Sequence, residues 1–166
     1  MASSIETAWL EAARALAAPG QPTPLYQALD RGLGAAVGHK LLTLMIYDAP
    51  SRSVERVYSN QPAAYPVGGS KPYSASTLFD RILIECRPAI LRDAAEIRAA
   101  FVDHALIARL GLASSLHLPV VHDGRALGMM NLLHEAGWYD EPHVGLAEPF
   151  AALAVAPFLV ALRGRA

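Results

Sequence analysis

The sequence contains little that would support metal, disulfide or nucleic-acid chemistry. Its 166 residues include a single cysteine, Cys86, which excludes an internal disulfide and a zinc site built from several cysteines. Fourteen basic residues balance fifteen acidic ones without forming a basic block, so we expect no nucleic-acid surface. The six histidines form no i, i+4 pair and no carboxylate-rich cluster. No metal and no cofactor are therefore predicted.

Long uncharged apolar runs are also missing. Apolar residues make up 53% of the chain, yet no segment approaches the roughly 20 that are needed to span a bilayer. The start, MASSIETAW, lacks the basic residues and apolar stretch of a secretion signal. We therefore expect a cytoplasmic protein that binds no membrane and buries its core in one domain.

Two helices are predicted before the first strand. Glu6 lies three residues after Ser3, the spacing of a capping box, and apolar residues then recur at helical spacing until Pro19-Gly20. A second helix opens at Thr23-Pro24 and continues to about Val37.

The next segments indicate strands and a loop. One strand is predicted over residues 40–48 and its partner over residues 54–59. The first strand alternates between an apolar side and a mixed side that includes Thr43 and Met45. Residues 60–73 are rich in proline and glycine, which predicts a long loop of the kind that often covers a binding site.

Three further elements precede the last hairpin. Ser76 or Thr77 caps a helix that reaches Cys86, and residues 88–92 then form a short strand. A single helix is predicted over residues 94–110.

The segment 111–134 predicts a β-hairpin that turns at Asp123-Gly124. Two loops fit its spacing. A two-residue type I′ turn pairs Val121 with Ala126 and leaves a polar amide on the mostly apolar face. A three-residue loop with a bulge pairs Val121 with Arg125 and separates the two faces cleanly, so we expect this loop.

With that loop, one face of the hairpin is mixed and the other is apolar. The mixed face carries Ser115, His117, Met129 and Asn131. The apolar face suits a sheet surface that lies under helices, and it consists of Leu116, Leu118, Val120, Ala126, Gly128, Met130 and Leu132.

The chain ends in a long apolar helix that begins after Asp140. Pro149 and Pro157 lie within it, and because proline lacks an amide hydrogen, a kink or break is expected near one of them. The apolar stripe in AALAVAPFLVAL serves either self-association or packing inside one subunit.

This order of elements indicates an antiparallel sheet with helices, the α+β class. From about residue 25 to residue 162, the chain resembles a GAF domain. The resemblance rests on KLLTLMIYD, on the hairpin GLASSLHLPVVHDGRALGMMNLL and on the final helix opened by YDEPHVGLAEPFAALA. It implies a PAS-like central sheet of about six strands, with terminal helices on one face and a ligand pocket under helices and loops on the other.

The resemblance also implies a sensory or regulatory module. Such a module binds a small molecule and forms a homodimer through its terminal helices. With no output domain in these residues, we expect a separate signalling protein to receive the signal. Residues 1–22 are assigned to an N-terminal dimerisation helix and residues 23–166 to the GAF-like domain. The alternative is an interaction module without a ligand, and an empty pocket that leaves His117 and Asn131 unsatisfied would favour the sensor.

The candidate ligand-binding residues lie on the mixed face and in its expected cover. The floor of the pocket is assigned to Thr43, Met45, Ser115, His117, Met129 and Asn131. The roof is assigned to the loop from Gly68 to Tyr73 and to Phe79, His104 and Arg109. Apolar walls with a few polar groups suit a small organic ligand. His117 and Arg109 also have structural interpretations, as a histidine paired inside the core and as a cation at a helix end.

No catalytic residue is predicted. Cys86 has no recognisable catalytic signature around it, and buried cysteines are common core residues. Free methionine-R-sulfoxide reductases, which are enzymes with a GAF fold, use cysteines before the final hairpin and acids on its strands. Here ALIARLGLASSLHLP has neither, and Asn131 and Leu133 stand where acids would be expected. The Cys-His pair of bilin-binding members and the Asn-Lys-x-x-Phe-Asp-Glu signature of cyclic-nucleotide-binding members are missing too, so an enzyme is the weakest alternative.

Overall fold

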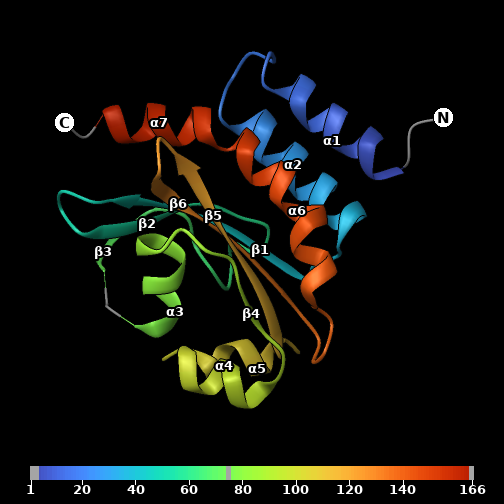
Figure 1. The fold of residues 1–166 in the computed structure, drawn as a ribbon, viewed down its shortest axis with the longest axis vertical. Coiled ribbons are helices and arrows are strands. Elements are labelled where there is room, and N and C mark those ends of the chain that lie inside the picture. The colour runs from blue at the N-terminus through green and yellow to red at the C-terminus, as the bar shows by residue number, and fades with distance from the viewer. Residues whose placement is uncertain (1–3, 74–75, 165–166) are drawn as a thin grey trace.

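A six-stranded antiparallel sheet lies between two groups of helices in the computed structural model, which describes residues 4–73 and 76–164 (Figure 1). The strand order is β3-β2-β1-β6-β5-β4. The strands are β1 (Leu41–Asp48), β2 (Ser53–Ser59), β3 (Ser70–Pro72), β4 (Ala89–Leu91), β5 (Ser114–His122) and β6 (Arg125–His134). The expected α+β architecture is thus confirmed.

The helices divide between the two faces of the sheet (Figure 1). The terminal helices cover one face, and they are α1 (Ser4–Ala15), α2 (Thr23–Ala36), α6 (Glu141–Leu153) and α7 (Val155–Arg163). The other face carries α3 (Thr77–Phe79), a π-helical turn η1 (Asp80–Ile84), α4 (Ala94–Ala100) and α5 (His104–Arg109).

The core under the terminal helices is formed by one side of each central strand. Leu44 of β1 and Met130 of β6 are fully buried there with Phe150 of α6 and Phe158 of α7. The C-terminal helix is bent by 45° at the break between α6 and α7, three residues before Pro157. This break confirms the expectation drawn from the prolines.

The edge strands are short, and each has a proline in it or next to it. Pro72 ends β3, and Pro88 directly precedes β4. Short edges with proline limit pairing with other chains. Strand β3 falls inside the segment 60–73 that was expected to be loop throughout, because three exposed residues paired only to β2 leave no alternating pattern to detect.

The hairpin turn differs from the expected one. Asp123 and Gly124 both have positive φ, 51° and 69°, and His122 pairs with Arg125. The loop is therefore the two-residue type I′ turn, and the prediction of a three-residue loop is wrong.

A bulge in β6 nevertheless restores the predicted division between the apolar and the mixed face in the part of the hairpin away from the turn. The register shifts between Val120 and Val121, which makes Leu127 the extra residue of β6. Ala126 lies before the bulge and packs with Met129 on the cavity side of the sheet, not with the terminal helices as expected. The bulge was predicted, but its position was wrong by several residues.

The predicted helix 94–110 is divided into α4 and α5. Phe101 between them has an extended backbone, with φ −121° and ψ 128°. This conformation turns its ring inward, where its centroid lies 6.3 Å from that of Phe79 and 5.7 Å from that of His117. Burial of an aromatic side chain thus outweighs the helical preference of the segment. The helix before β4 is capped by Ser76, as expected, but its π-helical turn η1 ends at Ile84, so the prediction that it reaches Cys86 is wrong by two residues.

Within the described ranges, no single helix is both long and apolar enough to cross a membrane. Only the bent pair α6 and α7 would meet that length and composition together.

The sheet requires a glycine where α7 crosses β6. A Cβ atom at Gly128 would lie 2.1 Å from the carbonyl oxygen of Met45 and 2.7 Å from the Phe158 ring. We expect Gly128→Ala to lower the free energy of unfolding by about 3 kcal/mol, measured by urea denaturation. The control is Gly145→Ala on an open face of α6, which should raise it by about 0.5 to 1 kcal/mol. Equal effects would contradict the close contact.

Candidate ligand-binding site

A cavity of about 460 Å³ lies against the sheet face opposite the terminal helices. Its floor comes from β1, β5 and β6, and consists of Leu41, Thr43, Met45, His117, Asn131 and Leu133. Four aromatic rings contribute to its walls, those of Tyr65, Tyr73, Phe79 and Phe101. The remaining cover includes the Gly68-Gly69 loop, β3 and the α4–α5 junction. The predominance of apolar and aromatic side chains is typical of small-molecule sites.

A chain of hydrogen bonds crosses the floor on neighbouring strands. Thr43, Asn131 and His117 are direct partners in the register of β1, β6 and β5. The Asn131 amide nitrogen donates to the Thr43 hydroxyl at 3.2 Å, and Asn131 Oδ1 lies 2.8 Å from His117 Nδ1. His117 Nε2 lies 2.8 Å from the Ser115 hydroxyl. These side chains are all buried, and burying a polar atom without a partner costs stability. The series of hydrogen bonds gives each of these side chains a partner.

The hydrogen-bond partners of His117 indicate which of its two ring nitrogens carries the hydrogen atom. Asn131 Oδ1 can only accept, so Nδ1 of the imidazole carries hydrogen and Nε2 accepts from Ser115. Burial lowers the pKa of His117 to about 4, although the hydrogen bond to Asn131 opposes this effect. The imidazole is therefore neutral at pH 7 and serves as a positioned hydrogen-bonding group. It is not a cationic group.

Six of the ten predicted site residues line the cavity. They are Thr43, Met45, Tyr73, Phe79, His117 and Asn131. The other four do not. Ser115 is fully buried behind the His117 ring, and Met129 is enclosed by Ile82 and Leu83 of η1.

His104 and Arg109 lie at the two ends of α5, away from the cavity lining. Both were expected to point inward from a continuous helix over residues 94–110. The break at Phe101 redirects α5, so Asp103 and Ile107 face the cavity instead.

One charged cluster at the cavity was missed by the sequence reasoning. Arg56 of β2 lines the cavity with its guanidinium 5.0 Å from the centroid of the Tyr65 ring. The Tyr65 hydroxyl donates to Asp103 at 2.9 Å, and burial, followed by this hydrogen bond, raises the pKa of the Tyr65 hydroxyl above its usual value. Arg56 pairs with Met45, a predicted floor residue, and this pairing would have placed it at the cavity. The pairing follows from the β-bulge between Leu44 and Met45, which shifts the register of β1 and β2.

The roof is held by side-chain contacts at Tyr73. Its hydroxyl donates to Asp80 of η1, and its ring lies 5.6 Å from that of Tyr47. The Arg52 guanidinium lies 5.2 Å from the centroid of the same ring. These contacts connect β3 to the helices that cover the sheet.

In the described part of the chain, no three His, Cys, Asp or Glu side chains come together as a metal site requires.

The buried neutral His117 makes stability depend on pH. Its pKa in the folded chain, about 4, lies below the value near 6.5 of an unfolded histidine. Between these values the unfolded state binds more protons, so this group costs stability as pH falls from about 6.5 to 4, by up to about 3 kcal/mol. We expect His117→Gln to show a flatter dependence of unfolding free energy on pH over this window. Parallel curves from urea denaturation would contradict the assignment.

Comparison with known proteins identifies the fold. The model of the GAF domain family matches residues 25–156. The GAF domain of Acinetobacter phosphoenolpyruvate-protein phosphotransferase superposes with a TM-score of 0.74 at 11% identity, covering 97% of this chain and 96% of that domain. Residues 122 to 287 of a methyl-accepting chemotaxis protein superpose with a TM-score of 0.67 at 17% identity, covering 95% and 98%.

A longer structure shares the fold as well. The chromophore-binding domain of the bacteriophytochrome RpBphP3 from R. palustris superposes with a TM-score of 0.67 at 12% identity. The match covers 98% of this chain but 62% of that domain, so the chain spans less than two thirds of it. No curated protein matches the chain. At these identities the structural likeness shows the fold alone, whereas the family model covers most of the sequence, and the chain therefore belongs to the GAF domain family of sensory and regulatory domains.

Proposed function

We propose that this GAF domain binds a small organic molecule in the sheet-face cavity and acts as a ligand-responsive regulator in the cytoplasm. The observation that carries the proposal is a cavity of about 460 Å³ with aromatic walls and a polar floor. Its volume lies within the range of roughly 300 to 1,000 Å³ that is common for small-molecule sites. The single cysteine suits a reducing compartment.

Two features of the cavity were expected to distinguish a sensor from an interaction module, and they point in different directions. The cavity is open, as a sensor requires. However, His117 and Asn131 are hydrogen-bonded to each other and to neighbouring hydroxyls, so the second condition that would favour the sensor, unsatisfied polar groups on the floor, is not met. A ligand would therefore rest on a prearranged floor, which lowers the entropic cost of binding.

The central strands provide a route from ligand to terminal helices. Thr43 and Asn131 face the cavity, while their chain neighbours Leu44 and Met130 are buried under the terminal helices. A ligand shifts such an arrangement only if it binds two packings of the sheet and helices with different affinity. We propose that the shift is passed on through a dimer or to a separate signalling protein.

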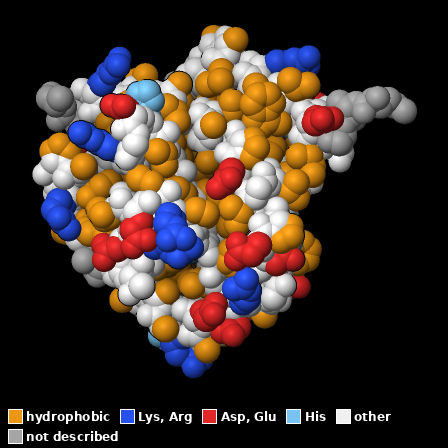
Figure 2. Space-filling view, in the orientation of Figure 1, with side chains coloured by type: hydrophobic (Ala, Val, Ile, Leu, Met, Phe, Trp, Pro, Cys, Tyr) orange, Lys and Arg blue, Asp and Glu red, His pale blue; other side chains and the backbone are white. Residues whose placement is uncertain are grey.

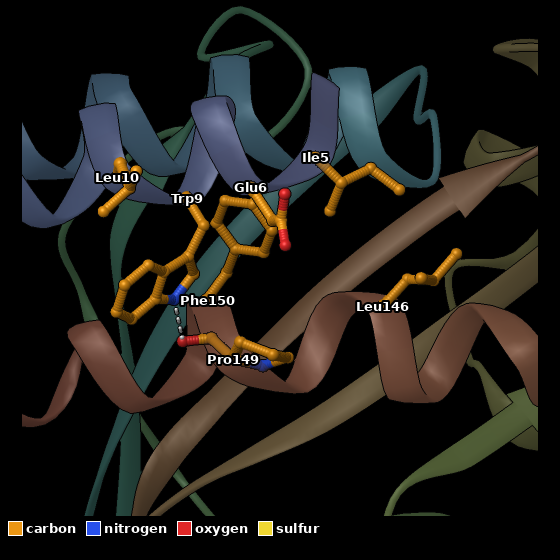
Figure 3. Close-up of a pocket in the computed structure, with 7 residues that line it drawn as sticks. All are labelled: Ile5, Glu6, Trp9, Leu10, Leu146, Pro149 and Phe150. Carbon is orange, nitrogen blue, oxygen red and sulfur yellow. Dashed lines mark hydrogen bonds between the residues drawn. The ribbon is translucent and has the colours of Figure 1, made fainter. Parts of the chain in front are cut away.

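Apolar surface on the terminal helices supports the dimer. Hydrophobic side chains gather over α1 and α6 in Figure 2, where Leu10 and Leu146 are 42% and 38% exposed. Between these helices lies an apolar groove of about 510 Å³, and Trp9 donates to the carbonyl of Pro149 at 3.0 Å across it (Figure 3). A second copy of the chain would cover this surface, and the use of residues 1–22 for dimerisation stays a prediction.

Ligand binding is tested by native mass spectrometry of the purified full chain, compared with the same sample after denaturation. We expect an added mass below about 500 Da, a bound molecule that fits the cavity. Ala100→Trp places a large ring at the cavity wall and should abolish the added mass. Ala99→Trp, one residue earlier and exposed on α4, is the matched control and should retain it. A bare chain that also binds no member of a metabolite library would contradict the proposal.

Dimerisation is tested by sedimentation velocity. We expect the unmodified chain to sediment as a dimer and Leu146→Glu to sediment as a monomer, because the charge would be buried in the apolar interface. The matched control is Ile84→Glu, since Ile84 is 56% exposed on the opposite side of the sheet. A monomeric parent chain, or equal effects of both variants, would contradict the assignment of the interface.

A further inference from the structure

Arg56 is held at the cavity without a matching carboxylate. It lines the cavity from β2, and the ion pairs found among the described residues do not include it. Its guanidinium stacks near the Tyr65 ring, and Nη1 donates to the carbonyl of Pro66 at 3.0 Å. These contacts fix the side chain in one place, and the nearby Asp103 carboxylate acts on its charge without forming an ion pair with it. A half-buried cation of this kind is costly unless an anion reaches it.

The guanidinium retains unused hydrogen-bond donors. Its Nε is buried and has no hydrogen-bond partner among the described residues. The hydrogen bonds seen in this part of the chain engage Nη1, so Nε and Nη2 are left without a partner, and Nε, which is closed to solvent, meets a carboxylate only after a shift of the side chain. Two parallel N–H groups on one edge of a guanidinium match the two oxygens of a carboxylate.

The balance of charge around the cavity favours a single negative charge. Arg56 and Lys71 are the basic residues that line it, and Asp103 is the acidic one. The Asp103 carboxylate, which accepts from the Tyr65 hydroxyl, keeps its charge and offsets one of the two positive charges. His117 is neutral, as derived above. One positive charge is thus left over at a site whose other walls are apolar and aromatic.

We propose that the ligand of this GAF domain is a monocarboxylate with an apolar or aromatic body, bound through its carboxylate by Arg56. The proposal rests on the proposed function and names the chemical class of the ligand. The apolar body lies among Phe79, Phe101 and Met45, above the floor at His117 and Asn131.

The test compares acids with their neutral analogues. The probes are benzoate, phenylacetate, 3-phenylpropanoate and hexanoate, each with its primary amide, titrated into the full chain by calorimetry at pH 7 and low salt. An amide retains the shape of its acid but not the charge. We expect at least one acid to bind about tenfold or more tightly than its amide, the discrimination typical of a charge-assisted pair.

Variants of Arg56 and Asp103 test whether these residues cause the preference for acids over amides. Arg56→Gln should reduce the affinity for the acid to that for the amide. The matched control is Arg109→Gln, an exposed arginine outside the cavity, which should retain the tenfold preference. Asp103→Asn keeps an acceptor for the Tyr65 hydroxyl and removes a competing negative charge, so it should strengthen acid binding several-fold and leave the amides unchanged. This second variant keeps the test valid if Arg56→Gln does not fold.

The outcomes separate this proposal from the proposed function. Equal binding of acids and amides, blocked by Ala100→Trp, would overturn the carboxylate class and retain the cavity as a ligand site. An acid preference that survives in Arg56→Gln, or one that Asp103→Asn leaves unchanged, would overturn the role of Arg56. No binding by either series, together with no added mass on the purified chain, would overturn both proposals.

Discussion

The antiparallel pairing of β1 with β6 at the centre of the sheet is the constraint on which the rest of the structure depends. Both strands are buried on both faces, so their alternating side chains must suit two environments at once. Leu44 and Met130 form an apolar surface for the terminal helices, while Thr43 and Asn131 face the cavity. A slip of one residue would exchange these sets and bury the polar pair under the terminal helices. The register of this pair therefore determines both the core and the site.

The polar floor is a consequence of this register. Three direct partners on β1, β6 and β5 place a hydroxyl, an amide and an imidazole in one row. Their hydrogen bonds to each other make the floor stable without a ligand, and buried polar chains of this kind specify a single arrangement of the strands. Among the described residues that line the cavity, a buried group without a hydrogen-bond partner lies on the strand next to β1, at Arg56 Nε. The structural role of the floor and the binding role that we propose for Arg56 thus lie in adjacent parts of the same surface.

The alternation of apolar residues predicted the faces of the sheet, apart from Ala126, and four of the cavity residues, while the order of elements gave the α+β class and the expected loop and helix over the sheet gave Tyr73 and Phe79. The errors occurred where tertiary contacts outweigh local pattern. The bulge at Leu127 and the split at Phe101 each depend on packing across the sheet, which a single segment does not encode. Arg56 was missed for the same reason, because the bulge in the pairing of β1 with β2 decides which face it occupies.

Phe101 connects these observations to the ligand response that we propose. Its ring contacts the imidazole at the floor and the Phe79 ring in the wall, and its extended backbone ends α4, three residues before α5 begins. Asp103, two residues later, is tied to Tyr65, on which the Arg56 guanidinium stacks. A ligand that fills the space beside Phe101 and reaches Arg56 would press on both ends of this short connection. Because α4 and α5 pack on the cavity side alone, the effect would reach the terminal helices through β1 and β6, whose small residue at Gly128 leaves the sheet in direct contact with Phe158 of α7.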